Sequence, residues 1–100
     1  MKINFGTEIT DFDGNPVQNG KAGPLLAGTA CAQALLHSQI PDDQPDGAEK
    51  VARFTLAQKV HGNGMVDLEA KEIVTILGVA EKVWGTLVYG RLHLLLNGKG

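Results

Sequence analysis

The chain has 100 residues, of which 43% are hydrophobic and 20% are charged, and its net charge at pH 7 is −2. These values indicate one globular domain with a modest core and argue against global disorder. The chain has nine basic and eleven acidic residues. This balance disfavours binding to nucleic acid or to a membrane surface, because both are bound largely through Lys and Arg.

The first twenty residues predict a small amount of β-structure. Ile3, Phe5 and Ile9 are flanked by polar residues, which is a short strand signal. Residues 11–16 are dense in turn formers and include Asp-Gly and Asn-Pro. We therefore expect a β-hairpin or an extended arm over residues 2–19, lying against the helices because an isolated hairpin is marginal in water.

The first helix is predicted to begin near Gly28 or Thr29, with Thr29 as its N-cap, and to end at His37 or Ser38. Its inner face carries small residues that would let another helix approach closely. These are Ala27, Ala30, Cys31, Ala34 and Leu35. Residues 40–47 then contain two prolines, three aspartates and one glycine, which predicts a loop.

A second helix is predicted over residues 48–60, and its apolar residues lie on more than one side, which is typical of a helix buried on more than one side. A glycine-rich stop follows it. The third helix is predicted to follow Asp67 as its N-cap, with Glu69 in the first turn. Its apolar face comprises Ile73, Ile76, Leu77, Ala80, Val83 and Trp84.

Gly85-Thr86 predicts a break, after which Thr86 caps a last helix that ends near Leu96. A β-strand over residues 87–94 remains an alternative, because the pattern is short. The apolar residues of this segment cover most of a helix's circumference, and Gly90 would allow close backbone contact. Because so short a chain has little interior for such a helix, we expect it to pack on a partner or a second copy. The candidate interface residues are Trp84, Leu87, Val88, Arg91, Leu92 and Leu95.

Together these patterns predict a mainly α (α+β) fold in a single domain over residues 1–100. A short N-terminal β-hairpin or arm would precede three to four packed helices in a helical core over residues 28–96. Within the last helix, Arg91 needs a carboxylate partner or an exit to solvent, and a structural ion pair is the expected solution.

No motif in the chain predicts catalysis, a cofactor or a metal site. Asp11, Asp13 and Asn15 have the spacing of a calcium loop, but the Gly and Glu that such a loop needs at its sixth and twelfth positions are missing. The three histidines, His37, His61 and His93, have no partners at metal-binding spacing. The lone cysteine, Cys31, sits in an alanine-rich helical pattern and is expected to be a small buried side chain.

Several segments resemble a family of small proteins encoded by bacteriophages and prophages. They are Ile3-Asn4-Phe5, residues 11–17, Ala34-Leu35-Leu36, residues 49–60, Val66-Asp67-Leu68 and residues 87–91. The run Arg53-Phe54-Thr55-Leu56-Ala57-Gln58-Lys59-Val60 is the most distinctive of them. The resemblance implies an accessory phage protein without enzymatic activity.

We therefore expect a phage protein that acts through protein–protein contacts, for example in virion or tail assembly, with itself or another phage protein as partner. The apolar character of the last helix motivates this expectation. No segment approaches about 20 consecutive apolar residues, so the cytoplasm of the bacterial host is the expected location and a membrane association is not expected. The alternative is a small nucleic-acid-binding regulator, in which the second and third helices form a helix-turn-helix.

Overall fold

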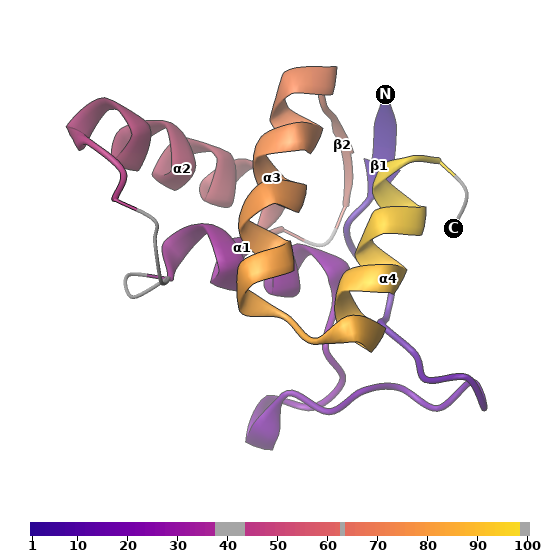
Figure 1. Cartoon of the computed structure of the whole chain (residues 1–100). Coiled ribbons are helices and arrows are strands. Elements are labelled where there is room, and N and C mark those ends of the chain that lie inside the picture. The colour runs from indigo at the N-terminus through magenta and orange to yellow at the C-terminus, as the bar shows by residue number, and fades with distance from the viewer. Residues whose placement is uncertain (38–43, 63, 99–100) are drawn as a thin grey trace.

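The computed structural model describes residues 1–37, 44–62 and 64–98, and its fold is mainly α-helical, as the sequence predicts (Figure 1). The elements in chain order are β1 (Lys2–Asn4), the 3-10 helix η1 (Gly20–Ala22), α1 (Ala27–Leu36), α2 (Gly47–Val60), β2 (Met65–Asp67), α3 (Ala70–Val83) and α4 (Thr86–Leu96). Residues 40–43 of the predicted loop lie outside the described residues, as does Ser38. Residues 44–46 have no regular structure, as predicted, whereas Gly47 is the first residue of α2.

Helix α1 lies at the centre of the fold and packs against both α2 and α3, while α4 packs beside α3 (Figure 1). The small residues of α1 serve this purpose, because Ala30, Cys31 and Ala34 are fully buried and allow the neighbouring helices to come close. The core also takes apolar side chains from the N-terminal segment and from each of the other helices. Its largest fully buried members are Phe5, Leu25, Leu68, Ile76, Leu92, Leu96 and Val60.

The N-terminal strand pairs with a segment far away in sequence. Strand β1 is antiparallel to β2, with Ile3 opposite Val66, and they form a two-stranded sheet. Strand β2 was not predicted, because Asp67 was expected to be the N-cap of the third helix. The strand that we expected in residues 2–19 is therefore present, but its partner is a three-residue strand between α2 and α3.

Residues 8–26, the N-terminal loop, run below the helices in Figure 1 and return to the start of α1. Three backbone hydrogen bonds close this loop in a ring. The Ile9 N–H donates to the Leu25 carbonyl at 2.8 Å, the Leu25 N–H to the Val17 carbonyl at 2.7 Å, and the Val17 N–H to the Ile9 carbonyl at 2.8 Å. Ile9 and Leu25 are buried in the core, so the ring attaches an otherwise irregular loop to the helices.

The helix ends differ in detail from the sequence expectations. Helix α1 begins at Ala27, so Thr29 lies inside its first turn and is not the N-cap. Helix α3 begins after Glu69, not after Asp67, and the Glu72 carboxylate accepts a hydrogen bond from the Glu69 N–H at 2.8 Å. In α4, Thr86 is the first helical residue and Gly85 the N-cap, and the β-strand alternative over residues 87–94 is wrong.

A close approach of two backbones explains the glycine at the start of α1. The Gly28 N–H donates to the Phe5 carbonyl at 2.8 Å, and a Cβ on Gly28 would overlap the carbonyl oxygen of Val60, the last residue of α2. Any side chain at this position would therefore push α1 away from α2. Gly78 in α3 is different, because its missing Cβ points into open space.

We expect Gly28→Ala to lower the free energy of unfolding by about 1–3 kcal/mol, because the added methyl group overpacks the contact between α1 and α2. Urea denaturation measures the change. The matched control, Gly78→Ala, should raise the free energy of unfolding by about 0.5–1 kcal/mol, because alanine favours a helix interior over glycine. Equal effects of the two substitutions would contradict this explanation.

Glu72 links the start of α3 to the end of α2. The hydrogen bond from the Glu69 N–H is the main cause that lowers the pKa of Glu72 from its usual value, and Lys59, whose Nζ lies 3.2 Å from the carboxylate, lowers it further. A lowered folded-state pKa means that the unfolded chain binds a proton more readily. This contribution to stability is therefore present at neutral pH and is lost as the pH falls through the folded-state pKa.

Glu72→Gln should consequently cost about 1 kcal/mol near pH 7 and much less near about pH 3. Urea denaturation at both pH values checks the difference. Glu81→Gln, which alters an exposed carboxylate on the same helix, serves as the control and should change stability little at either pH. A cost for Glu72→Gln that is the same at both pH values would contradict the assignment.

Candidate protein–protein interface

Helix α4 has two distinct faces, and its own chain covers only one of them. Val88, Leu92 and Leu96 are spaced at i, i+4 and i+8, and all three are buried in the core. Leu87 and Leu94 lie on the other side of the helix, with Leu94 42% exposed. Most of the apolar surface of α4 is therefore buried within its own chain, and a narrower apolar stripe remains exposed to solvent.

The candidate interface residues fall into two groups. Val88 and Leu92 belong to the core, while Leu87, Arg91 and Leu95 are only partly buried. Trp84 is also partly buried, and its indole N–H donates to the Ala30 carbonyl of α1 at 2.9 Å. Of the six candidates, Leu87 and Arg91 are the two that line the surface hollow described below.

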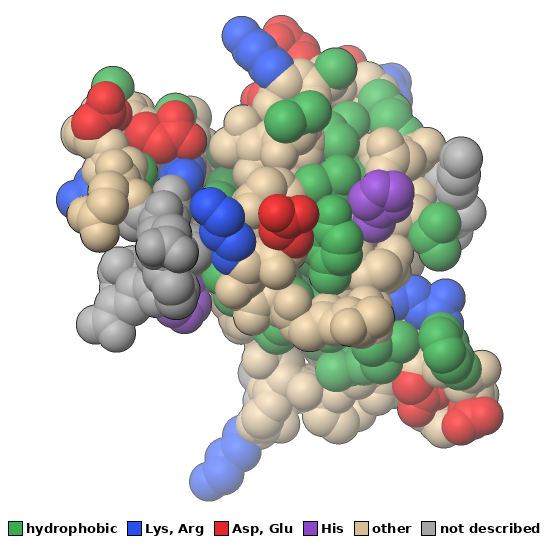
Figure 2. Space-filling model, in the orientation of Figure 1, with side chains coloured by type: hydrophobic (Ala, Val, Ile, Leu, Met, Phe, Trp, Pro, Cys, Tyr) green, Lys and Arg blue, Asp and Glu red, His purple; other side chains and the backbone are tan. Residues whose placement is uncertain are grey.

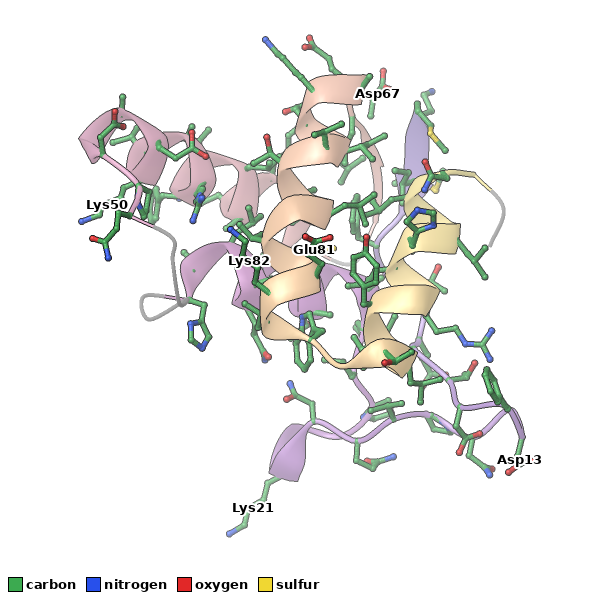
Figure 3. All side chains as sticks on the ribbon, in the orientation of Figure 1. Asp13, Lys21, Lys50, Asp67, Glu81 and Lys82 are labelled. Carbon is green, nitrogen blue, oxygen red and sulfur yellow. The ribbon has the colours of Figure 1, made fainter. Side chains whose placement is uncertain are left out.

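Phe12 is 93% exposed, although it is one of the largest apolar side chains in the protein. It stands on a tight turn that Asp11 holds together, because the Asp11 carboxylate accepts hydrogen bonds from the N–H groups of Asp13 at 2.9 Å and Asn15 at 3.0 Å. Gly14 supplies the positive φ of +85° that the turn requires. In Figure 3, Asp13 marks the tip of this turn, and it lines a surface hollow together with residues of α4.

Arg91 connects this turn to α4. Its Nε–H donates to the Thr10 carbonyl and its Nη2 to the Asp11 carbonyl, both at 2.9 Å. The guanidinium carbon also lies 5.7 Å from the centre of the Phe12 ring, within cation–π range. Two backbone carbonyls thus take the place of the carboxylate partner that we predicted for Arg91.

A hollow of about 950 Å³ lies between the turn and the outer face of α4. This hollow, called here the Phe12–α4 groove, is lined by Asp11, Phe12, Asp13, Thr86, Leu87, Tyr89, Gly90, Arg91, His93 and Leu94. Figure 2 shows hydrophobic side chains gathered where α4 meets the N-terminal loop, between basic and acidic ones. The groove is mostly apolar in its lining, which suits protein contact better than chemistry on a charged substrate.

The residues that could suggest a metal or a nucleophile have structural roles in the fold. Asp11 and Asn15, two of the three residues with calcium-loop spacing, are hydrogen-bonded to each other in the turn. Over residues 1–37, 44–62 and 64–98, no three His, Cys, Asp or Glu side chains are grouped closely enough to hold a metal ion. Cys31 is fully buried, as predicted, and burial raises the pKa of its thiol to about 12.

His61 and His93 occupy surface positions. His61 is the C-cap residue of α2. His93 is exposed on α4, and the centre of its ring lies 5.9 Å from that of Tyr89. Its place in the lining of the groove makes it part of the candidate interface.

The geometry between α2 and α3 does not favour a helix-turn-helix. Strand β2 separates the two helices, where that motif has a turn of three or four residues. Lys21, Lys50 and Lys82 come from three different elements and point in different directions in Figure 3. These cations do not form the single basic surface on which nucleic-acid binding depends.

No helix in the described part of the chain has both the length and the apolar character needed to cross a membrane. Comparison with protein families, with curated proteins and with solved structures finds no match for this chain.

Phe12 was not predicted to be a contact residue, because the turn-forming residues around it indicate only a backbone turn. A usable signal was present, since an aromatic residue between two aspartates in a tight turn has no apolar neighbours with which to be buried. Such a residue is either accidental or part of a contact surface. The groove beside it favours the second explanation.

Arg91→Lys should loosen the turn, because an ammonium group cannot reproduce the two-pronged contact of the guanidinium with the Thr10 and Asp11 carbonyls. We expect a loss of about 1–2 kcal/mol in the free energy of unfolding. Hydrogen exchange should also become faster in peptides covering residues 11–17. The control is Arg53→Lys on α2, which should leave exchange in those peptides unchanged, and unchanged exchange in Arg91→Lys would contradict the role of Arg91.

Proposed function

We propose that this chain is a phage-encoded protein without enzymatic activity that acts through protein–protein contacts of the Phe12–α4 groove, in virion or tail assembly. The observation that carries the proposal is Phe12, 93% exposed beside a mostly apolar groove. An exposed aromatic residue is unfavourable in water but suits the centre of an interface, where aromatic residues contribute much of the binding energy.

The rigidity of the turn supports this proposal. The Asp11 carboxylate and the Arg91 guanidinium both hold the backbone around Phe12, so the Cα that carries the ring is held in a defined position. A side chain held in place before binding loses little conformational freedom when a partner covers it. The turn therefore has the properties of a preformed contact site.

The phage context rests on the sequence resemblance. Residues 11–17 and 87–91 are both among the segments that carry it, and both contribute to the Phe12–α4 groove. Assembly proteins of virions act by repeated contacts between copies, which suits a small chain with an uncovered apolar surface. Self-association is the form of this function that we propose.

Size-exclusion chromatography coupled to light scattering, over a concentration series, tests the proposal. We expect a dimer or a larger closed assembly whose fraction rises with concentration, because apolar surface of this kind is removed from water on association. The reference for the monomer is the same protein in mild denaturant below its unfolding transition. A monomer at every concentration would contradict self-association.

A further inference from the structure

We propose that the peptide bond after Lys21 is a cleavage site for proteases that recognise a basic residue, and that the cut chain keeps its fold. The site lies in residues 19–23, called here the loop tip, which contains η1 and forms the far end of the N-terminal loop. The proposal is independent of the Phe12–α4 groove and of the function proposed for it.

Lys21 is placed differently from the other basic residues. Within residues 1–37, 44–62 and 64–98, it is the one Lys or Arg that lies outside the α-helices and β-strands. Lys2 belongs to β1, and the remaining ones are in α2, α3 and α4, namely Lys50, Arg53, Lys59, Lys71, Lys82 and Arg91. A protease binds its substrate as an extended segment, so a bond inside a helix or a paired strand is cut only after that element unfolds locally.

The loop tip stands apart from the helices. It lies below them in Figure 1, and in Figure 3 the Lys21 side chain points away from the rest of the molecule. Gly20 and Lys21 are both exposed. Apart from their chain neighbours, no described residue has an atom within 4 Å of the place where a Cβ on Gly20 or Gly23 would be. An enzyme can therefore approach the backbone on both sides of Lys21.

Few bonds have to break before the loop tip can become extended. The Asn19 N–H donates to the Gly23 carbonyl at 2.7 Å, and among the described residues this is the one backbone hydrogen bond outside η1 that involves the loop tip. The exposed turn at Phe12 is held more firmly, because the Asp11 carboxylate and the Arg91 guanidinium both bind its backbone. Exposed loop tips made of small and polar residues are the preferred sites of proteolytic cleavage.

The side chain of Lys21 supplies the recognition. Proteases that cut after a basic residue bind its cation through a carboxylate in their specificity pocket. None of the ion pairs in the described part of the chain involves the Lys21 ammonium. Lys21 can therefore enter such a pocket without losing an ion pair within its own chain.

Cleavage adds one water molecule across the amide bond after Lys21. It leaves a carboxylate on Lys21 and an ammonium group on Ala22. Because the bond belongs to an exposed loop, water solvates both new charges and neither has to be buried. The cut therefore adds no unfavourable charge to the core.

The piece that precedes the cut is attached to the rest of the fold by its own side chains. Ile3, Phe5 and Ile9 are all buried in the core. Strand β1 pairs with β2, which lies on the other side of the cut in sequence. We expect residues 1–21 to stay bound after cleavage, because leaving would expose three large apolar side chains to water.

Backbone hydrogen bonds also join the two pieces across the cut. The Ile9 N–H donates to the Leu25 carbonyl, and the Leu25 N–H donates to the Val17 carbonyl. Arg91 in α4 binds the Thr10 carbonyl. Cleavage after Lys21 breaks none of these bonds, so the ring that attaches the loop to the helices remains closed.

Limited proteolysis of the folded full chain by trypsin, followed over time by mass spectrometry, tests the site. We expect the fragments 1–21 and 22–100 first, with cuts inside α2, α3 and α4 at least about 100-fold slower. Lys21→Gln should abolish this first cut. The control is Lys82→Gln, which removes an exposed lysine inside α3 and should leave the first cut unchanged. Lys99 lies outside the described residues, and the mass of the product identifies a cut there.

The cut protein tests the second half of the proposal. After the protease is inhibited, size-exclusion chromatography should show both fragments eluting together at the volume of the uncut chain, and they should separate in concentrated urea. Circular dichroism should show unchanged helix content. A first cut inside α2, α3 or α4, or an unchanged first cut in Lys21→Gln, overturns the cleavage site. Release of residues 1–21 without urea overturns the claim that the cut chain keeps its fold.

Discussion

The ring of backbone hydrogen bonds among Ile9, Val17 and Leu25 is the constraint on which the uncovered surface of this protein depends. These residues are eight positions apart in sequence, and each donates to one of the others and accepts from the third. The ring closes an N-terminal loop that forms only isolated bridges within itself and no regular strand. It also determines where the turn at Phe12 stands relative to α4, and Arg91 completes the connection.

Helix α4 has apolar residues on more sides than its own chain can cover. A segment that is apolar almost all round would normally be fully buried, but a chain of this size has too little interior to surround it. The structure buries Val88, Leu92 and Leu96 against the core and covers part of the remaining surface with the turn at Phe12. Because Phe12 on this turn is itself exposed, the turn adds apolar surface at the place where it covers α4.

The sequence predicts the helices well because their signals are local. The 3.6-residue spacing of Ile73, Ile76 and Ala80 identifies the buried face of α3 without any knowledge of its neighbours. Strand β2 has no comparable signal, since its three residues become a strand only through pairing with β1 more than sixty positions away. The partners of Arg91 were beyond prediction for the same reason, because backbone carbonyls at Thr10 and Asp11 have no signature in the side-chain pattern.

The exposed ring of Phe12 is the feature of the Phe12–α4 groove that is unfavourable for the isolated chain. Gly90 lies inside α4 with nothing from outside its own stretch of helix within 4 Å of the place where a Cβ would be, and Gly78 in α3 is the same in this respect. Gly28 shows the contrasting case, in which the carbonyl of Val60 supplies the reason for glycine inside the fold. Sequences that fold well usually agree with their structure at each position, and exceptions tend to gather at functional sites. Gly78 in α3 has the same open space beside it as Gly90, so the exposed ring of Phe12 is the exception on which the proposed contact depends.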